Sequence, residues 1–318
     1  MRRSTRNWRG GQRGRSLVEL MVALAVGLVV LGAVLAMYAP LGATGRQAEA
    51  TARMSEDAAV AMNYLGSYLR MAGYSRPRVN APRSSVTVDG GTQGLADSHF
   101  VGAGLRGCDG GFTDPKAAGF ASLACASGVA GASAVAVRFE ADTRNTFPST
   151  DGQPTDCLAQ KVGAAAASAL DPSVSFTLVE SRFFVRQGSS GANELYCNGN
   201  GAGSSGGASW APMPLVPFVE HLQLRYGIAA DGGSGRVQDY VSAADIDELG
   251  GTLDQNWSRV ISVKACIVLR SETANQGADA AGARYVDCDG QLAASPDRSI
   301  RRSFTSVFTL RNRAEIAL

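Results

Sequence analysis

Residues 14–39 read GRSLVELMVALAVGLVVLGAVLAMYA, a stretch in which a glycine, an arginine and a glutamate precede a long apolar run. Residues 20–39 contain no charge and are rich in Leu, Val and Ala. A helix of that length spans about 30 Å, which is the thickness of the hydrocarbon core of a bilayer. We therefore expect residues 20–39 to form one transmembrane helix.

The segment before the apolar run is strongly basic. Residues 1–15 hold six arginines and no acid, although the whole chain has 30 Lys+Arg against 28 Asp+Glu and a net charge of only +2. Because positive residues stay on the cytoplasmic side of a membrane, the N-terminus is expected in the cytoplasm and the rest of the chain, from about residue 40, in the periplasm. The small net charge argues against an electrostatic nucleic-acid binder, so we predict no direct contact with nucleic acid.

Glu19 is a costly residue at the start of such a helix. A carboxylate at the centre of a bilayer costs about 2.5–3.5 kcal/mol, so an acid in a membrane helix needs a partner or a role. Cleavage between Gly14 and Arg15 would create an α-amine on Arg15 and make Glu19 the fifth residue of the new chain. Residues four apart share a helix face. The acid can therefore pair with the amine of its own chain, or with that of a neighbour when apolar helices stack.

This arrangement resembles the N-terminus of the type IV pilin family, whose precursors carry a short basic leader ending in glycine and a glutamate at the fifth mature position. The resemblance implies cleavage after Gly14 by a prepilin peptidase, methylation of the new N-terminus at Arg15, and docking of subunits guided by Glu19. Arg15 departs from the family, where the first mature residue is usually Phe. The alternatives are an ordinary signal anchor and a secretory signal cleaved near residues 48–50.

The helix is expected to continue to about Ala72 and to end at Gly73. Pro40 and Gly42 are expected to bend or loosen it. From Gln47 onwards apolar residues recur at spacings of three and four, which predicts an amphipathic helix that covers a globular head. The expected buried stripe consists of Met54, Ala58, Met62, Leu65, Leu69 and Ala72.

The remaining chain alternates between polar and apolar residues in several segments separated by loops rich in Gly, Ser and Asp. Such alternation predicts half-buried strands of an antiparallel sheet with one face on a helix. The predicted fold class is α+β, with a long N-terminal helix and a C-terminal antiparallel β-sheet head. The expected strands are residues 133–140, 173–186, 221–226, 261–269 and 304–310.

Three further stretches resemble one branch of the pilin family, the PilW-type minor pilins: residues 68–74 at the helix end, 218–227 in a central strand, and 304–313 in the last strand. The resemblance implies a protein that acts with other minor pilins and the major pilin. Such proteins prime or cap a type IV pilus at or near its tip, support a tip adhesin, and contribute to adhesion and twitching motility. A pseudopilin of a type II secretion system is the alternative within the same superfamily.

Six cysteines lie in the part expected in the periplasm, an oxidising compartment. Their number is even and no pair is spaced C-x-x-C, which favours disulfides over a zinc site. Fifteen pairings are possible, and pairing in sequence order is our expectation. It gives Cys108–Cys125, Cys157–Cys197 and Cys266–Cys288.

Catalytic and metal-binding patterns are weak, so we predict no enzyme, no metal and no cofactor. Residues 201–206 fit G-x-G-x-x-G and residues 203–207 fit G-x-S-x-G, but neither pattern lies between a strand and a helix as those motifs require. The chain has only two histidines, His99 and His221. Residues 287–290 resemble a fragment of a calcium loop and are interpreted as a tight turn beside a disulfide. A membrane-anchored periplasmic binding domain or hydrolase stays open as an alternative.

The sequence thus predicts a basic leader at residues 1–14, a pilin helix at 15–73 and a periplasmic head at 74–318. The predicted protein crosses the inner membrane once, contacts its lipid and the prepilin peptidase, and later joins a pilus at the cell surface.

Overall fold

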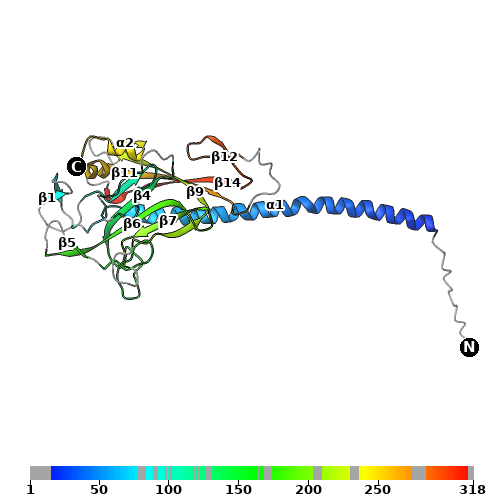
Figure 1. Ribbon diagram of the computed structural model, residues 1–318, viewed down its shortest axis with the longest axis horizontal. Coiled ribbons are helices and arrows are strands. Elements are labelled where there is room, and N and C mark those ends of the chain that lie inside the picture. Colours follow the sequence, from blue (N-terminus) through cyan, green and yellow to red (C-terminus); the bar gives the residue numbers. More distant parts are fainter. Residues whose placement is uncertain are drawn as a thin grey trace, which may run out of the picture. The chain divides into compact units, whose positions relative to one another are not determined.

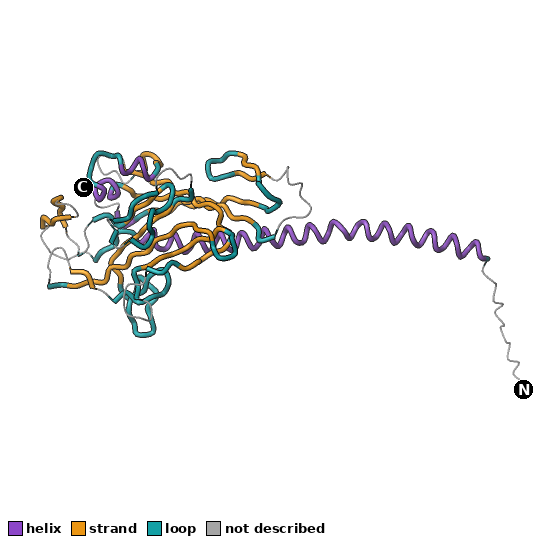
Figure 2. The backbone as a smooth tube through the Cα atoms, viewed as in Figure 1, coloured by secondary structure: helices purple, strands orange, loops and turns teal. Residues whose placement is uncertain are grey.

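The computed structural model describes residues 16–76, 84–88, 92–96, 99, 102–117, 119–120, 122–126, 131–163, 165–167, 173–202, 210–229, 236–273 and 284–313 (Figure 1). The chain divides into two compact units, residues 1–49 and 50–318. Outside the helix at the N-terminal end, the described chain consists mainly of strands and loops, as Figure 2 shows. The structure is therefore α+β, as the sequence predicts.

Helix α1 runs over Leu17–Met71. It begins one residue after Ser16 and ends one residue before Ala72, and Gly73 follows in the left-handed region at φ 68°. Pro40 and Gly42 lie inside this helix, so they do not end it. Leu17–Met37 forms a candidate membrane span of 21 residues with a mean hydropathy of 2.8, and none of it is buried. The predicted span, residues 20–39, began three residues later.

A six-stranded antiparallel sheet forms one layer of the second unit. It has the order β3-β4-β6-β7-β8, with β5 paired to β6. Strands β4 and β6 coincide with the predicted strands at residues 133–140 and 173–186. The strands are β3 (Leu105–Cys108), β4 (Ala134–Ala141), β5 (Ala165–Ala167), β6 (Ser175–Gln187), β7 (Asn193–Gly199) and β8 (Met213–Pro217).

A four-stranded antiparallel sheet has the order β10-β9-β11-β14. Figure 1 shows β9, β11 and β14 running side by side. Its three long strands are the ones predicted at residues 221–226, 261–269 and 304–310, whereas the sequence patterns missed the short edge strand β10. The strands are β9 (Val219–Ala229), β10 (Val237–Val241), β11 (Val260–Arg270) and β14 (Arg301–Thr309).

Two small hairpins and three short helical segments complete the described elements. The hairpins are β1–β2 and β12–β13, and both short α-helices start with a capping box, Ser242 with Asp245 and Thr252 with Gln255. Their bounds are β1 (Ser84–Val88), β2 (Thr92–Ala96), α2 (Ala243–Asp247), α3 (Leu253–Ser258), β12 (Arg284–Val286), β13 (Leu292–Ala294) and η1 (Arg311–Arg313).

Residues 50–71 of α1 pack within the second unit. The Tyr68 ring lies 5.4 Å from that of Phe183 in β6 and 6.2 Å from that of Phe139 in β4. The Tyr64 hydroxyl donates a hydrogen bond to the Cys157 carbonyl. All six residues of the predicted apolar stripe are buried, as are the core faces of both sheets. The amphipathic part of the helix therefore covers the head, as predicted.

Candidate functional site

The first turn of α1 carries Glu19. The turn is closed by the Leu20 N–H, which donates to the Ser16 carbonyl at 3.3 Å. A carboxylate here interacts favourably with the partial positive charge of the helix N-terminus. Glu19 is exposed and has no hydrogen bond or ion pair to any of the described residues. The acid is therefore available to a partner outside the described chain.

The helix surface beyond Glu19 is apolar and exposed on all sides. Leu17, Leu28, Val29 and Met37 are each about 70% or more exposed, at 77%, 69%, 73% and 74%. A patch of this size on a helix marks contact with lipid or with other helices. Glu19 is the one acid on this surface between Leu17 and Met37.

The two processing residues, Gly14 and Arg15, lie outside the described residues. Their geometry relative to Glu19 is therefore an expectation from helical periodicity, and their processing remains a prediction.

Three disulfides link the cysteines in sequence order. The Cα–Cα distances are 5.2 Å for Cys108–Cys125, 6.4 Å for Cys157–Cys197 and 5.7 Å for Cys266–Cys288. The first ties β3 to the following loop, the second ties the loop before β5 to β7, and the third ties β11 to the β12–β13 hairpin. Each one fixes a loop onto a sheet, which reduces the entropy of the unfolded chain.

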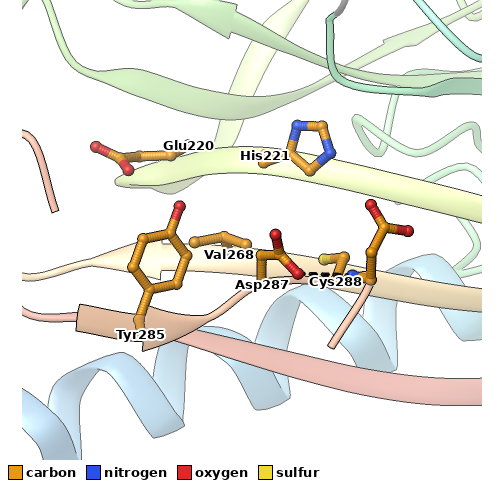
Figure 3. Close-up of a pocket in the computed structure, with 7 residues that line it drawn as sticks. Glu220, His221, Val268, Tyr285, Asp287 and Cys288 are labelled. Atoms are coloured by element: carbon orange, nitrogen blue, oxygen red, sulfur yellow. Dashed lines mark hydrogen bonds between the residues drawn. The ribbon is translucent and has the colours of Figure 1, made fainter. Parts of the chain in front are cut away.

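A pocket of about 320 Å³ lies between the four-stranded sheet and the β12–β13 hairpin (Figure 3). The sheet supplies Glu220, His221 and Val268, and the hairpin supplies Tyr285, Asp287, Cys288 and Asp289. Cys288 is the half of the third disulfide that holds the hairpin in place.

The carboxylates of this pocket are engaged by neighbours within the head. Arg301 donates to both oxygens of Glu220, at 2.6 and 2.8 Å, and Gln223 donates to Asp289 at 2.7 Å. Burial lowers the pKa of His221, while the nearby Asp289 and Asp287 act in the opposite direction. Burial therefore favours the neutral imidazole, and the carboxylates serve the structure of the hairpin.

The turn at residues 287–290 is held by the first aspartate. The Asp287 side chain accepts from the N–H groups of Asp289 at 3.0 Å and Gln291 at 2.8 Å, and Gly290 has φ 78°. A tight turn beside a disulfide is confirmed. Within the described ranges, no group of three or more His, Cys, Asp and Glu side chains could hold a metal ion.

The other histidine, His99, is part of a structural cluster. Its Nδ1 lies 3.2 Å from Oε1 of Glu140, and the Ser75 hydroxyl donates to Oε2 of the same carboxylate at 2.6 Å. Ser75 and His99 thus both contact the same carboxylate. In a catalytic triad, the serine would contact the histidine and only the histidine would contact the acid. The glycine patterns at residues 201–207 lie mostly outside the described residues.

Sequence reasoning missed the network around Arg301. This side chain is 3% exposed, contacts Glu220 and Asp297, and stands beside the pocket. The only available signal was an arginine three residues before a predicted strand, and nothing in the sequence indicates that its partners are 81 and 4 residues away.

Two family models match the chain. One describes type IV pilus-assembly protein W and matches residues 182–312, and the other describes the prokaryotic N-terminal methylation motif and matches residues 9–35. The first match runs from the middle of β6 into η1 and includes the whole four-stranded sheet, and the second includes Gly14, Arg15 and Glu19.

Among solved structures, a type IV-like pilin from Thermus thermophilus is similar at 13% identity, with a TM-score of 0.39, over 83% of this chain and 99% of that one. No curated protein matches the chain. The two family matches support a resemblance to type IV minor pilins. The exposed apolar helix together with the methylation motif fits a membrane-anchored pilin, and the family points to a structural, non-enzymatic role among other pilus components.

Proposed function

We propose that this chain is a minor pilin of a type IV pilus, cleaved after Gly14 and incorporated at or near the tip, where it primes or caps assembly. Before assembly it crosses the inner membrane once with its head in the periplasm. Its partners are other minor pilins, the major pilin and a tip adhesin, and through them it supports adhesion and twitching motility.

The observation that carries this proposal is the combination of two matches at opposite ends of one chain. The methylation motif spans the segment that contains Gly14 and Glu19, and the pilus-assembly family matches the sheet that ends the head. A signal anchor on an unrelated periplasmic domain requires neither. The leader at residues 1–14, the helix at 15–73 and the head at 74–318 then have separate tasks: targeting, lateral association and partner specificity.

The physical reason for helix-driven assembly lies in the exposed apolar surface of Leu17–Met37. In a bilayer this surface is satisfied by lipid, and in a filament it is satisfied by neighbouring helices. Glu19 pairs with the α-amine of an adjacent subunit, which offsets the cost of burying both charges and sets the stagger between helices.

The test is mass spectrometry of the N-terminal peptide of the chain extracted from membranes. We expect a mature chain that starts at Arg15 with a methylated α-amine. A Gly14→Val variant should accumulate as a precursor longer by the leader, as should the wild-type chain in cells without prepilin peptidase. A wild-type chain that still begins at Met1 contradicts the proposal, and loss of secretion with normal pili on deletion would assign the chain to a secretion pseudopilus.

A further inference from the structure

The two large sheets of the head have five outer strands, and four of these are protected against further pairing. Strand β5 has only three residues. Strand β8 carries Pro214 and Pro217, which have no N–H to donate. Strand β10 has five residues and a register shift between Val237 and Asp239. Strand β3 is buried over its whole length and packs against α2 and α3. Proline, bulges and cover are the devices by which proteins protect sheet edges.

Strand β14 has no proline and no register shift, and although the short strand β12 packs near it, β12 pairs only with β13 and not with β14. Its nine residues pair with β11 in one continuous register, from Ser262 opposite Thr309 to Arg270 opposite Arg301. The segment 303–309 contains no charge, proline or glycine and is built from serine, threonine, valine and phenylalanine. Threonine, valine and phenylalanine have high strand propensity.

The register shows which backbone groups face away from the sheet. The Leu310 N–H donates to the Ile261 carbonyl at 2.8 Å, and the Ser271 N–H donates to the Ile300 carbonyl at 2.8 Å. Because hydrogen-bonded pairs alternate along an antiparallel ladder, the even-numbered residues of β14 bond to β11. The odd-numbered residues point their N–H and C=O groups outwards: Ser303, Thr305, Val307 and Thr309.

Three of the four residues with outward groups are exposed, and Ser303 is half-buried. Thr305, Val307 and Thr309 are exposed, and Val307 has 55% of its surface accessible. Within the described chain, no hydrogen bond from another element reaches the backbone of these residues. An unpaired strand of this kind is a template for a strand of another chain.

The charge around β14 specifies the partner. Residues 298–313 contain five arginines and no acid. Glu220 and Asp297 neutralise Arg301, whereas Arg302, Arg311 and the nearby Lys264 are exposed and form no ion pair with the described residues. Lys264 lies directly opposite Val307. An acidic strand is therefore attracted to this edge, and a second copy of β14 is repelled.

We infer that the free edge of β14 accepts an extended, acidic strand from another subunit of the assembly, and this inference rests on the proposed function. The incoming strand pairs with the outward N–H and C=O groups of Ser303, Thr305, Val307 and Thr309 and extends the four-stranded sheet. Carboxylates on the incoming strand face Lys264 and Arg302. The bonds to the backbone provide affinity, and the charges select the partner.

Hydrogen exchange of the full chain tests this, measured in detergent micelles and again in isolated filaments. We expect the amides of Ser303, Thr305, Val307 and Thr309 to exchange at least about tenfold more slowly in filaments. The amides of Phe304, Ser306 and Phe308 already bond to β11 and are the internal control. Equal exchange of the outward amides in both states overturns the inference, and absence of the chain from filaments contradicts the proposed function instead.

Matched variants separate pairing from folding. Val307→Pro removes one outward N–H without touching the ladder to β11, and we expect it to reduce incorporation into filaments at least about tenfold, while Val307→Thr, which keeps the N–H, behaves as wild type. If Val307→Pro melts below the wild type, the double variant Lys264→Glu/Arg302→Glu replaces it, with the same reduction expected. The inference is overturned if the folded variant is incorporated into filaments as well as the wild type is. A crosslink from position 305 to the β14 strand of a second copy also overturns it.

Discussion

The ring of Phe308 in β14 lies directly against Gly66 in α1, so closely that a Cβ atom on Gly66 would lie 2.3 Å from Cε1 of the ring. The absence of a side chain at this one position allows the helix to approach the last strand. The Arg70 guanidinium, one turn further along, lies 5.3 Å from the centre of the same ring. Asn312 also donates to the Arg70 carbonyl at 2.9 Å. The end of α1 is thus packed against β14 and η1.

Gly66→Ala is therefore expected to destabilise the head, although alanine favours a helix over glycine by about 1 kcal/mol. Overpacking against a ring that is 5% exposed costs about 1–3 kcal/mol, so the clash wins. We expect a lower melting temperature for the full chain in detergent. Gly45→Ala, in the same helix with nothing within 4 Å, is the control and should leave the melting of the head unchanged. Equal melting of both variants would contradict the packing argument.

Much of this fold could be predicted because it rests on periodicity. The buried stripe from Met54 to Ala72 follows helical spacing, and the long strands β4, β6, β9, β11 and β14 alternate strictly enough to be recognised. Strands β3, β7 and β8 were missed because their residues are buried on both faces or interrupted by proline, so they show no alternation. Short strands such as β12 are held by a disulfide, which leaves no trace in the pattern of polar and apolar residues.

The candidate assembly site stays a prediction, and it could be proposed from the sequence because its chemistry is local. Gly14, Arg15 and Glu19 lie within six residues, and in a helix starting at Arg15 the last two would share one face. The open edge of β14 was not predictable in this way. A strand has an open edge only if it pairs on one side, and the strand order of the whole sheet decides which strand that is.

Removing the third disulfide should free the β12–β13 hairpin from the four-stranded sheet. The cross-link closes a loop of 22 residues, for which the chain-entropy estimate is about 3 kcal/mol. We expect Cys266→Ala/Cys288→Ala to unfold at a lower urea concentration than the wild type and to be cut by protease near residues 287–290. Cys108→Ala/Cys125→Ala is the matched control, since it should lose a similar free energy without exposing the hairpin. A hairpin that stays resistant shows that Gln223 and Asp289 hold it without the disulfide.

The Asp297 carboxylate should contribute to stability in a way that depends on pH. Hydrogen bonds from Arg301 hold the pKa of Asp297 well below its usual value. Since the folded-state pKa is lower than the unfolded one, this contribution is complete above pH about 4 and is lost as the pH falls further. Asp297 is about half exposed, so solvent screening reduces the effect. We expect Asp297→Asn to flatten the acid side of the stability curve, measured by urea unfolding from pH 5 to 2.

The comparison with an Arg301→Met background separates this pair from other carboxylates. There, Asp297→Asn should change the slope much less, because the arginine that lowers the pKa of Asp297 most has gone while the hydrogen bonds from Ser299 remain. An unchanged slope for Asp297→Asn in the wild-type background would show that the pair does not couple to folding.

Glu19→Ala should separate membrane insertion from assembly. Removing the acid makes Leu17–Met37 more apolar, so we expect the helix still to insert, and the compact unit of residues 50–318, which contains the head, still to fold. In the proposed assembly, the variant lacks the partner for the α-amine of the adjacent subunit. We therefore expect normal amounts of chain in the membrane fraction and a wild-type melting temperature. We also expect at least about tenfold less chain in sheared filaments, since leaving one partner of a buried ion pair alone costs about 3–5 kcal/mol.

The matched control is Glu49→Ala, which removes an exposed acid of the same helix beyond the apolar span and should assemble as wild type. Glu19→Gln distinguishes charge from hydrogen bonding: incorporation at the level of Glu19→Ala means that the charge is required, whereas wild-type incorporation of both variants would remove Glu19 from the assembly mechanism.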